Sequence, residues 1–314
     1  MQLTASLTAV SALLFVLVNQ INVFAIPTGH QNLYNRETSN DTNGTPLISR
    51  ILFECVDTPP PPIRTPIISL PNEDPRDFTD QSYAGLVTLG NRRNNFRMII
   101  DTGSAHFWLL TGFQGTHNGI GPGSLGTFQL SNLPFSILYR DRSQAIGKVG
   151  VDRLTIGRAS VEEGLVGVAE IVHGFVTTTK ADRILGLASS RQSTMRQHTV
   201  VETLFARRAI PAMATGVKLS RLADRTSGEV SLGASKFDPR SQVASSNTRA
   251  DGLWGIRVAG LTVNNQRIPI ASAILDTGAQ VIPAPPNAGG QFNLAKQGSI
   301  VRPQDDGTSL AIIP

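Results

Sequence analysis

The sequence predicts an all-β fold, and three observations lead to this class. Charged residues make up only 16% of the 314 residues, whereas 29 are glycines, a composition that favours strands and turns over long surface helices. The apolar residues occur in short runs bounded by glycine, asparagine and proline. A helical pattern is visible at residues 200–208, where Pro211 would stop it. The apolar content of 40% is sufficient for a folded core and excludes disorder throughout the chain.

The first 25 residues have the features of a signal peptide. Residues 10–18 form a short apolar run, and Val23 and Ala25 frame a cleavage site before Ile26. An uncleaved membrane anchor is the alternative, but the run is shorter than the roughly 20 residues that span a bilayer. We therefore expect a secreted, extracellular protein without stable membrane association.

Residues 26–79 are expected to be a propeptide or a disordered linker. The segment is polar, and the prolines at positions 59–62 force an extended backbone with few hydrogen bonds. Two acceptor sequons for N-glycosylation begin at Asn40 and Asn43. The single cysteine, Cys55, excludes an intramolecular disulfide, so burial of the core must stabilise the folded part.

Strands are expected from residue 83 onward, where the short apolar runs begin. Each run has the length of a strand and is bounded by turn-forming residues. Short strands at regular spacing are typical of barrels and sandwiches. The expected strands are residues 83–90, 96–100, 107–110, 135–139, 153–156, 163–169, 228–233 and 254–258.

An internal repeat links two distant parts of the chain. Residues 98–105 and 273–280 each form an apolar strand that ends in Asp-Thr-Gly, with Asp101 in the first copy and Asp276 in the second. A single Asp-Thr-Gly is a common turn, because glycine supplies the left-handed backbone position. Two copies are different, since a duplicated half can bring both strand ends face to face about a pseudo-two-fold axis.

Two carboxylates in this arrangement are suited to general acid–base chemistry. In a partly desolvated cleft they cannot both ionise, so Asp101 and Asp276 would share one proton. The ionised group can take a proton from a bound water as the water attacks an amide carbon. The protonated group can donate to the carbonyl oxygen of that amide.

The remaining residues of the two turns are expected to support the pair. Gly103 and Gly278 let the two backbones approach each other, and the hydroxyls of Thr102 and Thr277 can hydrogen-bond across the axis. Ser104 is expected to donate to the first carboxylate rather than to act as a nucleophile, because no Gly-x-Ser-x-Gly elbow surrounds it.

Further landmarks accompany the two turns in a fixed order. Trp108 follows the first turn directly after a phenylalanine, and Tyr139 lies within residues 135–143. An apolar-apolar-Gly segment lies at residues 182–187, and a strand at residues 228–233 precedes the second turn. With the two Asp-Thr-Gly turns, this set resembles the pepsin-like (A1) aspartic peptidases, in particular the fungal secreted members.

The resemblance implies a bilobal pepsin-like fold whose N-terminal β lobe is residues 80–240. It implies that Asp101 and Asp276 are catalytic. It also implies that Tyr139 belongs to a flap hairpin that closes over the substrate, and that this tyrosine bonds Trp108.

The sequence departs from the family pattern in three places. The C-terminal β lobe, residues 241–314, is expected to be partial, because few residues follow Asp276. Arg140 and Arg142 stand where the family usually has glycines, so the flap tip must differ in shape and carry positive charge. Ala279 replaces a hydroxyl residue, which removes one hydrogen bond to the second carboxylate.

We expect an aspartic-type endopeptidase, a hydrolase made as a zymogen, that cleaves peptide bonds between apolar residues at acidic pH. Its partners would be protein or peptide substrates, and the chain would be a monomer. The alternative is a catalytically impaired or inactive homologue, a secreted peptide-binding or inert protein, because the second lobe is incomplete. A third possibility is a dimer that completes the missing lobe, as in retroviral proteases.

Other classes of function are not indicated. The net charge of +5 could suggest an acidic partner, but the arginines are scattered and no basic cluster alternates with aromatic residues, so no nucleic acid is expected. His106 and His117 lie nearest the first turn, and neither has a partner at metal-ligand spacing. We expect neither a metal nor a cofactor.

Overall fold

The computed structural model describes residues 60–71, 80–91, 94–112, 118–120, 126–174, 180–195, 197–219, 228–234, 250–279, 284–295, 300–303 and 309–312. The predicted signal peptide, both sequons and Cys55 lie outside these residues. Within the described ranges, no helix is long and apolar enough to cross a membrane.

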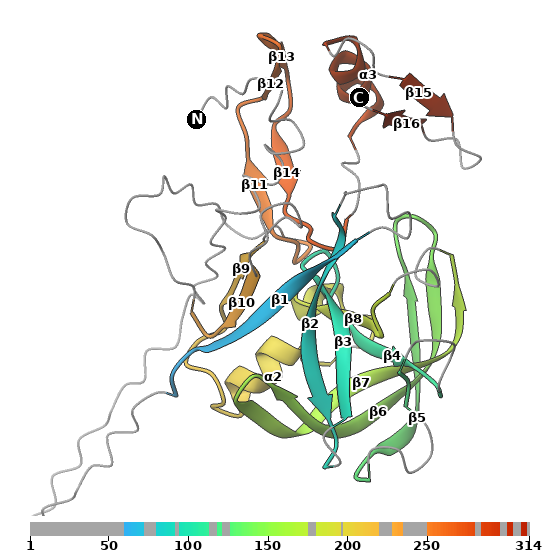
Figure 1. The fold of residues 1–314 in the computed structure, drawn as a ribbon, viewed down its shortest axis with the longest axis vertical. Helices are drawn as coiled ribbons and strands as arrows, with labels where there is room; N and C mark the ends of the chain where they lie inside the picture. The colour runs from blue at the N-terminus through green and yellow to red at the C-terminus, as the bar shows by residue number, and fades with distance from the viewer. Residues whose placement is uncertain are drawn as a thin grey trace, which may run out of the picture.

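A ten-stranded sheet forms the body of the molecule and curls into a barrel (Figure 1). Its strands lie in the order β5-β6-β7-β4-β8-β3-β2-β1-β10-β9, and β2 also pairs with β6, which closes the curl. Most neighbours are antiparallel, but β3 with β8 and β4 with β7 are parallel. The strands are β1 (Ile63–Pro71), β2 (Asp80–Leu89), β3 (Asn94–Asp101), β4 (Phe107–Leu110), β5 (Gln129–Leu138), β6 (Gln144–Ile156), β7 (Ala159–His173), β8 (Arg183–Gly186), β9 (Thr215–Lys218) and β10 (Gly228–Leu232).

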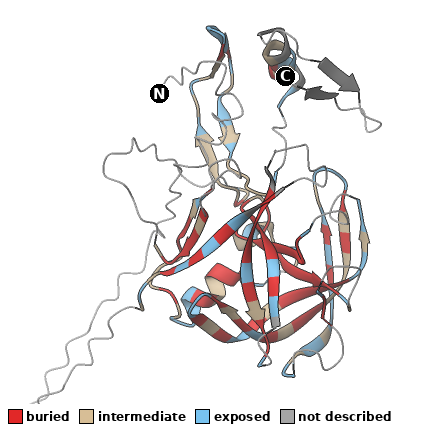
Figure 2. Ribbon diagram, viewed as in Figure 1, coloured by how far each residue is buried: buried red, intermediate tan, exposed pale blue. Residues whose placement is uncertain are grey.

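The predicted all-β class is confirmed, and buried apolar side chains fill both faces of the curled sheet (Figure 2). β4 is buried at all four positions, which explains its unbroken apolar sequence. Neighbours along a strand point to opposite faces, so Phe107 and Leu109 join one buried cluster while Trp108 and Leu110 join the other. The segment that follows the first Asp-Thr-Gly turn is therefore fixed within the core.

The sheet begins earlier than the sequence predicts. β1 lies inside residues 26–79, the expected propeptide or linker, and pairs with both β2 and β10. Its Ile63, Ile67 and Leu70 are buried. The preceding prolines and Pro66 within the strand concealed it, because proline cannot donate a ladder hydrogen bond and argues against a central strand. The folded body thus extends to Ile63 rather than starting near residue 80.

The predicted helix is present as α2 (Val200–Ala206) and packs against β7. Its N-terminus has a capping box, in which Thr199 accepts a hydrogen bond from the Glu202 amide and the Glu202 carboxylate accepts one from the Thr199 amide. The helix ends before Pro211, as the sequence predicts.

The elements after residue 254 project from the body as smaller units (Figure 1). Figure 2 shows the buried residues concentrated in the body, whereas the projecting elements share a small cluster of Val263, Ile268 and Ala288. The strands form three two-stranded sheets that pair β11 with β14, β12 with β13 and β15 with β16. These elements are β11 (Gly255–Arg257), β12 (Leu261–Val263), β13 (Gln266–Ile268), β14 (Ser272–Ile274), α3 (Pro286–Ala295), β15 (Ile300–Pro303) and β16 (Ser309–Ile312).

Candidate active site

Asp101 ends β3, and the neighbouring strand β8 holds its backbone. β8 runs parallel to β3 and places Gly186 beside Asp101. The Leu187 amide donates to the Asp101 carbonyl at 2.7 Å. A side chain on Gly186 would collide with the backbone at Ser104 and His106, so this close approach requires glycine. The segment at residues 182–187 therefore lies beneath the first turn.

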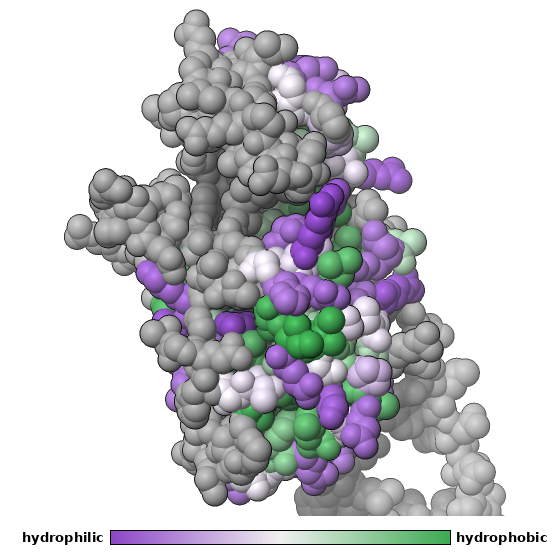
Figure 3. All heavy atoms as spheres, turned by 90° about the vertical axis from the view of Figure 1, so that its right-hand side faces the viewer, coloured by the Kyte–Doolittle hydropathy of each residue, from purple (hydrophilic) through white to green (hydrophobic). Residues whose placement is uncertain are grey.

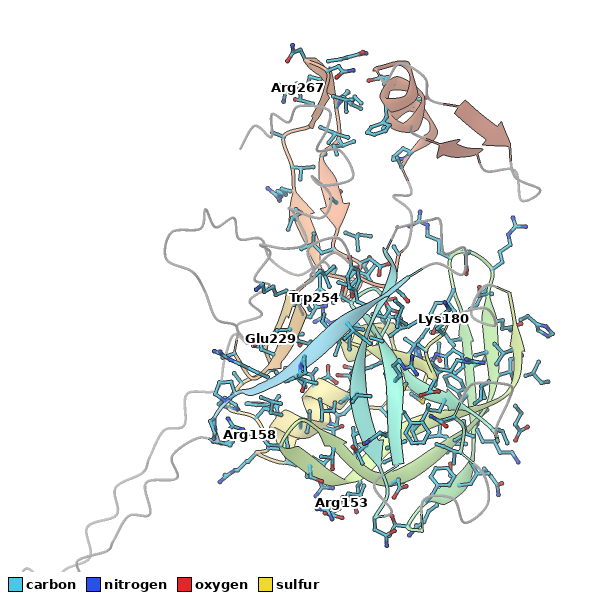
Figure 4. All side chains as sticks on the ribbon, in the orientation of Figure 1. Arg153, Arg158, Lys180, Glu229, Trp254 and Arg267 are labelled. Atoms are coloured by element: carbon cyan, nitrogen blue, oxygen red, sulfur yellow. The ribbon has the colours of Figure 1, made fainter. Side chains whose placement is uncertain are left out.

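Asp276 follows β14 and belongs to the projecting elements. The Leu275 amide donates to the Trp254 carbonyl at 2.8 Å, and the Trp254 indole Nε1 donates to the Leu187 carbonyl at 3.1 Å. Leu187 directly follows the strand that supports the first turn, so Trp254 joins the supports of both turns. Figure 4 shows Trp254 where the projecting strands meet the body.

Four hydrogen bonds interlock the two turns. The Thr102 amide donates to Thr277 Oγ1 at 3.2 Å, and the Thr277 amide donates to Thr102 Oγ1 at 3.0 Å. Thr102 Oγ1 then donates to the Leu275 carbonyl at 2.8 Å, and Thr277 Oγ1 donates to the Ile100 carbonyl at 2.5 Å. Each bond has a counterpart in the opposite turn, so the two turns are related by an approximate two-fold axis.

The glycines of the two turns make room for the opposing carboxylates. A Cβ atom on Gly103 would collide with the Asp276 carboxylate, and one on Gly278 would collide with the Asp101 carboxylate. Each aspartate thus lies against the glycine of the opposite turn. The structure brings together the two acidic residues that are far apart in the sequence.

The two carboxylates differ in their hydrogen bonds and in their burial. The Gly103 amide donates to Asp101 Oδ1 and the Gly278 amide donates to Asp276 Oδ1, both at 2.8 Å. Ser104 Oγ also donates to Asp101 Oδ2 at 2.5 Å, whereas an alanine occupies the corresponding position of the second turn. Asp101 is buried and Asp276 is half-buried.

The surroundings of Asp101 favour its protonated form. Burial, followed by the charge of Asp276, raises the pKa of Asp101 from 3.8 to about 7. The hydrogen bonds from Ser104 and Gly103 act in the opposite direction, because they stabilise the ionised carboxylate. A pair with this balance holds one proton in mildly acidic solution, which is the state required for combined acid and base catalysis.

Tyr139 lies between β5 and β6, at the start of a hairpin turn beside the first Asp-Thr-Gly turn. The indole Nε1 of fully buried Trp108 donates to Tyr139 Oη at 2.7 Å. Burial, and after it the negative charge of Asp101, holds the pKa of Tyr139 well above its ordinary value of 10.0. The phenol therefore stays protonated, and Tyr139, Trp108 and the first turn form one cluster.

The tip of this hairpin adopts a tight turn in spite of its bulky residues. The Arg142 amide donates to the Tyr139 carbonyl at 3.0 Å, and the Tyr139 amide donates to the Ser143 carbonyl at 2.8 Å. Arg142 has a φ of 66°, in the left-handed region that favours glycine. The Asp141 carboxylate accepts from the Ser143 amide and hydroxyl at 2.9 and 2.6 Å, which stabilises the turn.

Two buried side chains position the site although no local sequence pattern indicates this role. Asp182 accepts from the Arg97 amide and the Asn118 amide, both at 2.7 Å, and so joins β8 to β3. His106 accepts from the Thr194 amide at 2.9 Å. These partners are 64 to 88 residues apart in the sequence, beyond the reach of periodicity or motif spacing.

Within the described part of the chain, no group of three or more histidine, cysteine, aspartate or glutamate side chains could hold a metal ion. His106 lies in the core, and His117 is outside the described residues.

Comparisons with known proteins place the chain in a family. The family model "Eukaryotic aspartyl protease" matches residues 82–303. Pepsin A of Canis lupus familiaris is 28% identical over 225 residues, which are 68% of this chain and 57% of pepsin A. Rhizopuspepsin-2 of Rhizopus niveus is 27% identical over 220 residues, 67% of this chain and 56% of that protein. The chain thus spans little more than half the length of these curated relatives.

A solved structure shows the same fold. The aspartic proteinase from Irpex lacteus superposes with a TM-score of 0.60 at 21% sequence identity, and the match covers 77% of this chain and 69% of that one. At this level of identity the likeness concerns the fold.

Proposed function

The chain belongs to the eukaryotic aspartyl protease family, and on this premise we propose that it hydrolyses peptide bonds with a water molecule activated between Asp101 and Asp276. The observation that carries the proposal is the interlocking of the two Asp-Thr-Gly turns through Thr102 and Thr277. This arrangement holds the two carboxylates face to face, each against the glycine of the opposite turn.

The proposed reaction uses the single proton that the pair shares. The ionised carboxylate removes a proton from the water as its oxygen attacks the amide carbon, and the protonated carboxyl donates to the carbonyl oxygen. When the C–N bond of the resulting tetrahedral intermediate breaks, the amine leaves with the proton that the base took from the water. One hydroxyl of the intermediate gives its proton to the other carboxylate, which restores the shared proton of the pair. Gly103, Ser104 and Gly278 orient the carboxylates throughout, because their amide and hydroxyl groups fix the acceptor oxygens.

We assign Tyr139 and Trp108 to substrate binding. The Tyr139 oxygen accepts from the Trp108 indole, and the same hydroxyl group interacts with Ser104, which donates to Asp101, so the phenol is held beside the first turn. A peptide bound between the hairpin and the two turns would be covered by this flap, which excludes water from the reacting amide. Proteins and peptides are the proposed substrates, and the chain is proposed to act as a monomer without a cofactor.

The proposed biological setting is secretion. Residues 1–25 would be a signal peptide, and the residues between it and β1 would be a propeptide or linker that is removed when the zymogen matures. We propose an N-terminal lobe that contains β1 to β10 and a partial C-terminal lobe within residues 241–314. The pepsin and rhizopuspepsin relatives support the enzymatic reading, whereas secretion rests on the N-terminal sequence.

One observation favours a second candidate, a secreted homologue that binds peptides without cleaving them. Asp276 is half-buried, lacks the hydroxyl donor that Ser104 gives to Asp101, and follows a strand of three residues. A second carboxylate that is held this weakly could leave a binding cleft with little catalysis.

Binding of an uncleavable peptide separates these two candidates from an inert protein. The probe is an apolar peptide in which a hydroxyl-bearing carbon replaces the scissile amide, a mimic of the tetrahedral intermediate. Calorimetry at pH 4.5 should show tight binding that Asp276→Asn weakens at least tenfold for the protease. The non-catalytic candidate is supported if Asp276→Asn binds the mimic as tightly as wild type does and if wild type binds an unmodified peptide as tightly as the mimic. If wild type does not bind the mimic, both candidates are contradicted.

A further inference from the structure

The hairpin that carries the second carboxylate buries little apolar surface of its own. β11 and β14 contain no buried residue, and Ile274, two positions before Asp276, is 37% exposed. Figure 3 shows on one face of the molecule that apolar side chains gather over the body, whereas the coloured side chains of the projecting elements are mainly hydrophilic. Hydrophobic burial therefore contributes little to the placement of this hairpin, and polar contacts take a larger share.

One segment of the body, residues 186–192, is bonded tightly to the first turn. Three successive amides at its start donate to carbonyls at residues 101–106, over distances of 2.7 to 2.9 Å. These bonds run from Gly186 to His106, from Leu187 to Asp101 and from Ala188 to Ser104. The segment continues as a 3-10 helix, Ser190–Gln192, and the Ser190 amide donates to the Glu202 carboxylate at the start of α2 at 3.1 Å. Both ends of the segment are thus fixed to the body.

The same segment holds the linker of residues 250–254, which leads into β11. Three successive carbonyls of the linker each accept a hydrogen bond from it. The donors are Arg191 Nη1 to Ala250 at 3.2 Å, Gln192 Nε2 to Asp251 at 2.5 Å and the Ser189 amide to Gly252 at 3.3 Å. The fourth bond runs in the opposite direction, from the Trp254 indole to the Leu187 carbonyl at 3.1 Å. We call these four hydrogen bonds the clasp.

The close approach of the linker to the body requires a glycine at residue 252. Gly252 is buried and has a φ of 88°, in the left-handed region that favours glycine. A Cβ atom there would lie 2.9 Å from the Cβ of Arg191 and 3.2 Å from the Cβ of Ser189. A side chain at this position would push the linker away from the segment that donates to it.

We propose that the clasp positions Asp276 against Asp101, and that Gly252 and Gln192 are positioning residues for the reaction. The path to the carboxylate is short, because the Trp254 carbonyl accepts from the Leu275 amide at 2.8 Å, one residue before Asp276. A displaced linker therefore displaces the second turn. The threonines join the two turns directly, and the clasp joins the segments behind them. Two separate attachments fix the orientation of the second turn as well as its distance from the first.

The role in catalysis rests on the proposed function, and a matched pair of glycine variants tests it. Gly252→Ala disturbs the clasp. Gly260→Ala is the control, because Gly260 lies between β11 and β12 and also has a positive φ, 149°. A Cβ atom on Gly260 would meet Arg267 and Ile268 of the projecting elements rather than the body. Backbone strain is common to both variants, so a difference between them reports the clasp.

Steady-state kinetics should separate the two variants. In Gly252→Ala, kcat should fall by about a hundredfold, the scale on which a misplaced catalytic group loses rate. KM should stay within about threefold of wild type, because the flap and the body are unchanged. Gly260→Ala should keep both values. Equal kcat in the two variants, or a change confined to KM, would overturn the positioning role.

Titration of the carboxyl groups gives a readout that needs no activity. The charge of Asp276 helps to raise the pKa of Asp101 to about 7, so a displaced Asp276 should let this pKa fall. NMR of protein labelled with ¹³C at the aspartate carboxyls would follow it, with the signal assigned by its loss in Asp101→Asn. The pKa should fall to about 6 or lower in Gly252→Ala and stay unchanged in Gly260→Ala. The same pKa in both folded variants would overturn the proposal.

A second pair of variants carries the test if Gly252→Ala does not fold, as judged by circular dichroism. Gln192→Met and Arg267→Met each remove a side-chain donor to a backbone carbonyl. Arg267 donates to the Ala259 carbonyl at 2.6 Å, and Figure 4 shows it at the far end of the projecting strands, away from Trp254. Gln192→Met should lower kcat by roughly threefold to tenfold, the factor of one hydrogen bond, and Arg267→Met should not. Equal kcat and an equal pKa of Asp101 in this pair would overturn the proposal.

The two readouts distinguish failure of the clasp from failure of the proposed function. A wild type that cleaves no peptide, together with the expected fall in the pKa of Asp101, contradicts the proposed function alone. Cleavage by Gly252→Ala and Gln192→Met at the rate of wild type, with an unchanged pKa of Asp101, contradicts the clasp alone.

Discussion

At the scale of single residues, the two glycines of the Asp-Thr-Gly turns determine how closely the carboxylates approach. Neither Gly103 nor Gly278 has a positive φ, so their role differs from that of a turn glycine. Each is needed because the opposite carboxylate occupies the space where a Cβ atom would lie. This requirement follows from the pairing of the turns and is invisible in either turn alone.

Gly103→Ala should therefore abolish catalysis by separating the carboxylates. We expect kcat/KM to fall by at least about a hundredfold, the scale on which misplaced catalytic groups lose rate. Gly289→Ala in α3 is the matched control, since a Cβ atom there meets no atom within 4 Å. Steady-state kinetics on a peptide substrate would show the difference, and equal activity of the two variants would refute the close approach.

The buried ionisable residues also predict how stability depends on pH. The pKa of Asp101 is raised in the folded protein, so its contribution is full below pH 3.8 and is lost as pH rises toward about 7. The pKa of His106 is lowered, so its contribution is full above pH 6.5 and is lost as pH falls toward about 4. Each changes the free energy of unfolding by about 1.4 kcal/mol per pH unit between these limits.

Between pH 4 and pH 6.5 these two slopes oppose each other, and single variants should reveal them. Relative to wild type, Asp101→Asn should make the free energy of unfolding rise more steeply with pH, and His106→Gln should make it fall more steeply. Urea denaturation at pH 4.5, 5.5 and 6.5 would measure both slopes. If both variants change the slope of the free energy of unfolding in the same direction relative to wild type, one of the assigned pKa shifts is wrong.

At the scale of elements, the sequence predicts the strands of the body well because their apolar runs are bounded by turn residues. β1 was missed, since prolines before and within it conceal its alternation of buried Ile63, Thr65 and Ile67. β11 lies within the predicted strand 254–258, and β14 was indicated by the repeat before Asp276, whereas β12 and β13 have three residues each, too few for a periodic signal. The paired turns were predicted because they repeat, whereas the contact between His106 and Thr194 joins unrelated segments and has no sequence signature.

The interlocked threonines make the two turns one cooperative element. Thr102→Val removes the hydroxyl that accepts from the Thr277 amide and donates to the Leu275 carbonyl. This loss should lower the free energy of unfolding by about 1–3 kcal/mol. Adding Thr277→Val should cost less than the same change in wild type, because the four bonds form one network. Chemical denaturation of the single and double variants would give the coupling.

The control for this cycle is Thr88→Val, whose hydroxyl makes an exposed hydrogen bond to Asn95. A surface change of this kind should stay within about 0.5 kcal/mol of wild type. Additive losses for the two turn threonines would contradict the interlocked geometry.

At the scale of the whole molecule, stability is distributed unevenly. The barrel body contains both large buried clusters, whereas the described elements after residue 254 share one small cluster around Val263 and Ile268. The second carboxylate belongs to the weaker part, so the complete site depends on elements that bury little apolar surface.

The two tryptophans allow this difference to be measured. Trp108 is fully buried in the body and Trp254 is half-buried at the junction, and the chain contains no other tryptophan. In Trp108→Phe, the remaining fluorescence should change at a lower urea concentration than in Trp254→Phe. Circular dichroism of both variants is the control that the strands of the body have formed. If the fluorescence of the two variants changes at the same urea concentration, the body and the projecting elements unfold as a single cooperative unit.

The central claim is that Asp101 and Asp276 together activate water, and cleavage of an unfolded protein substrate by the secreted product from pH 3 to pH 7 tests it most directly. Wild type should cleave in acid and lose activity as pH rises toward 7, where the shared proton is lost. Asp101→Asn and Asp276→Asn should each be inactive although folded, and Asp276→Asn should bind the uncleavable peptide at least tenfold more weakly than wild type. Cleavage that persists in either variant, or its absence from folded wild type, would contradict the account.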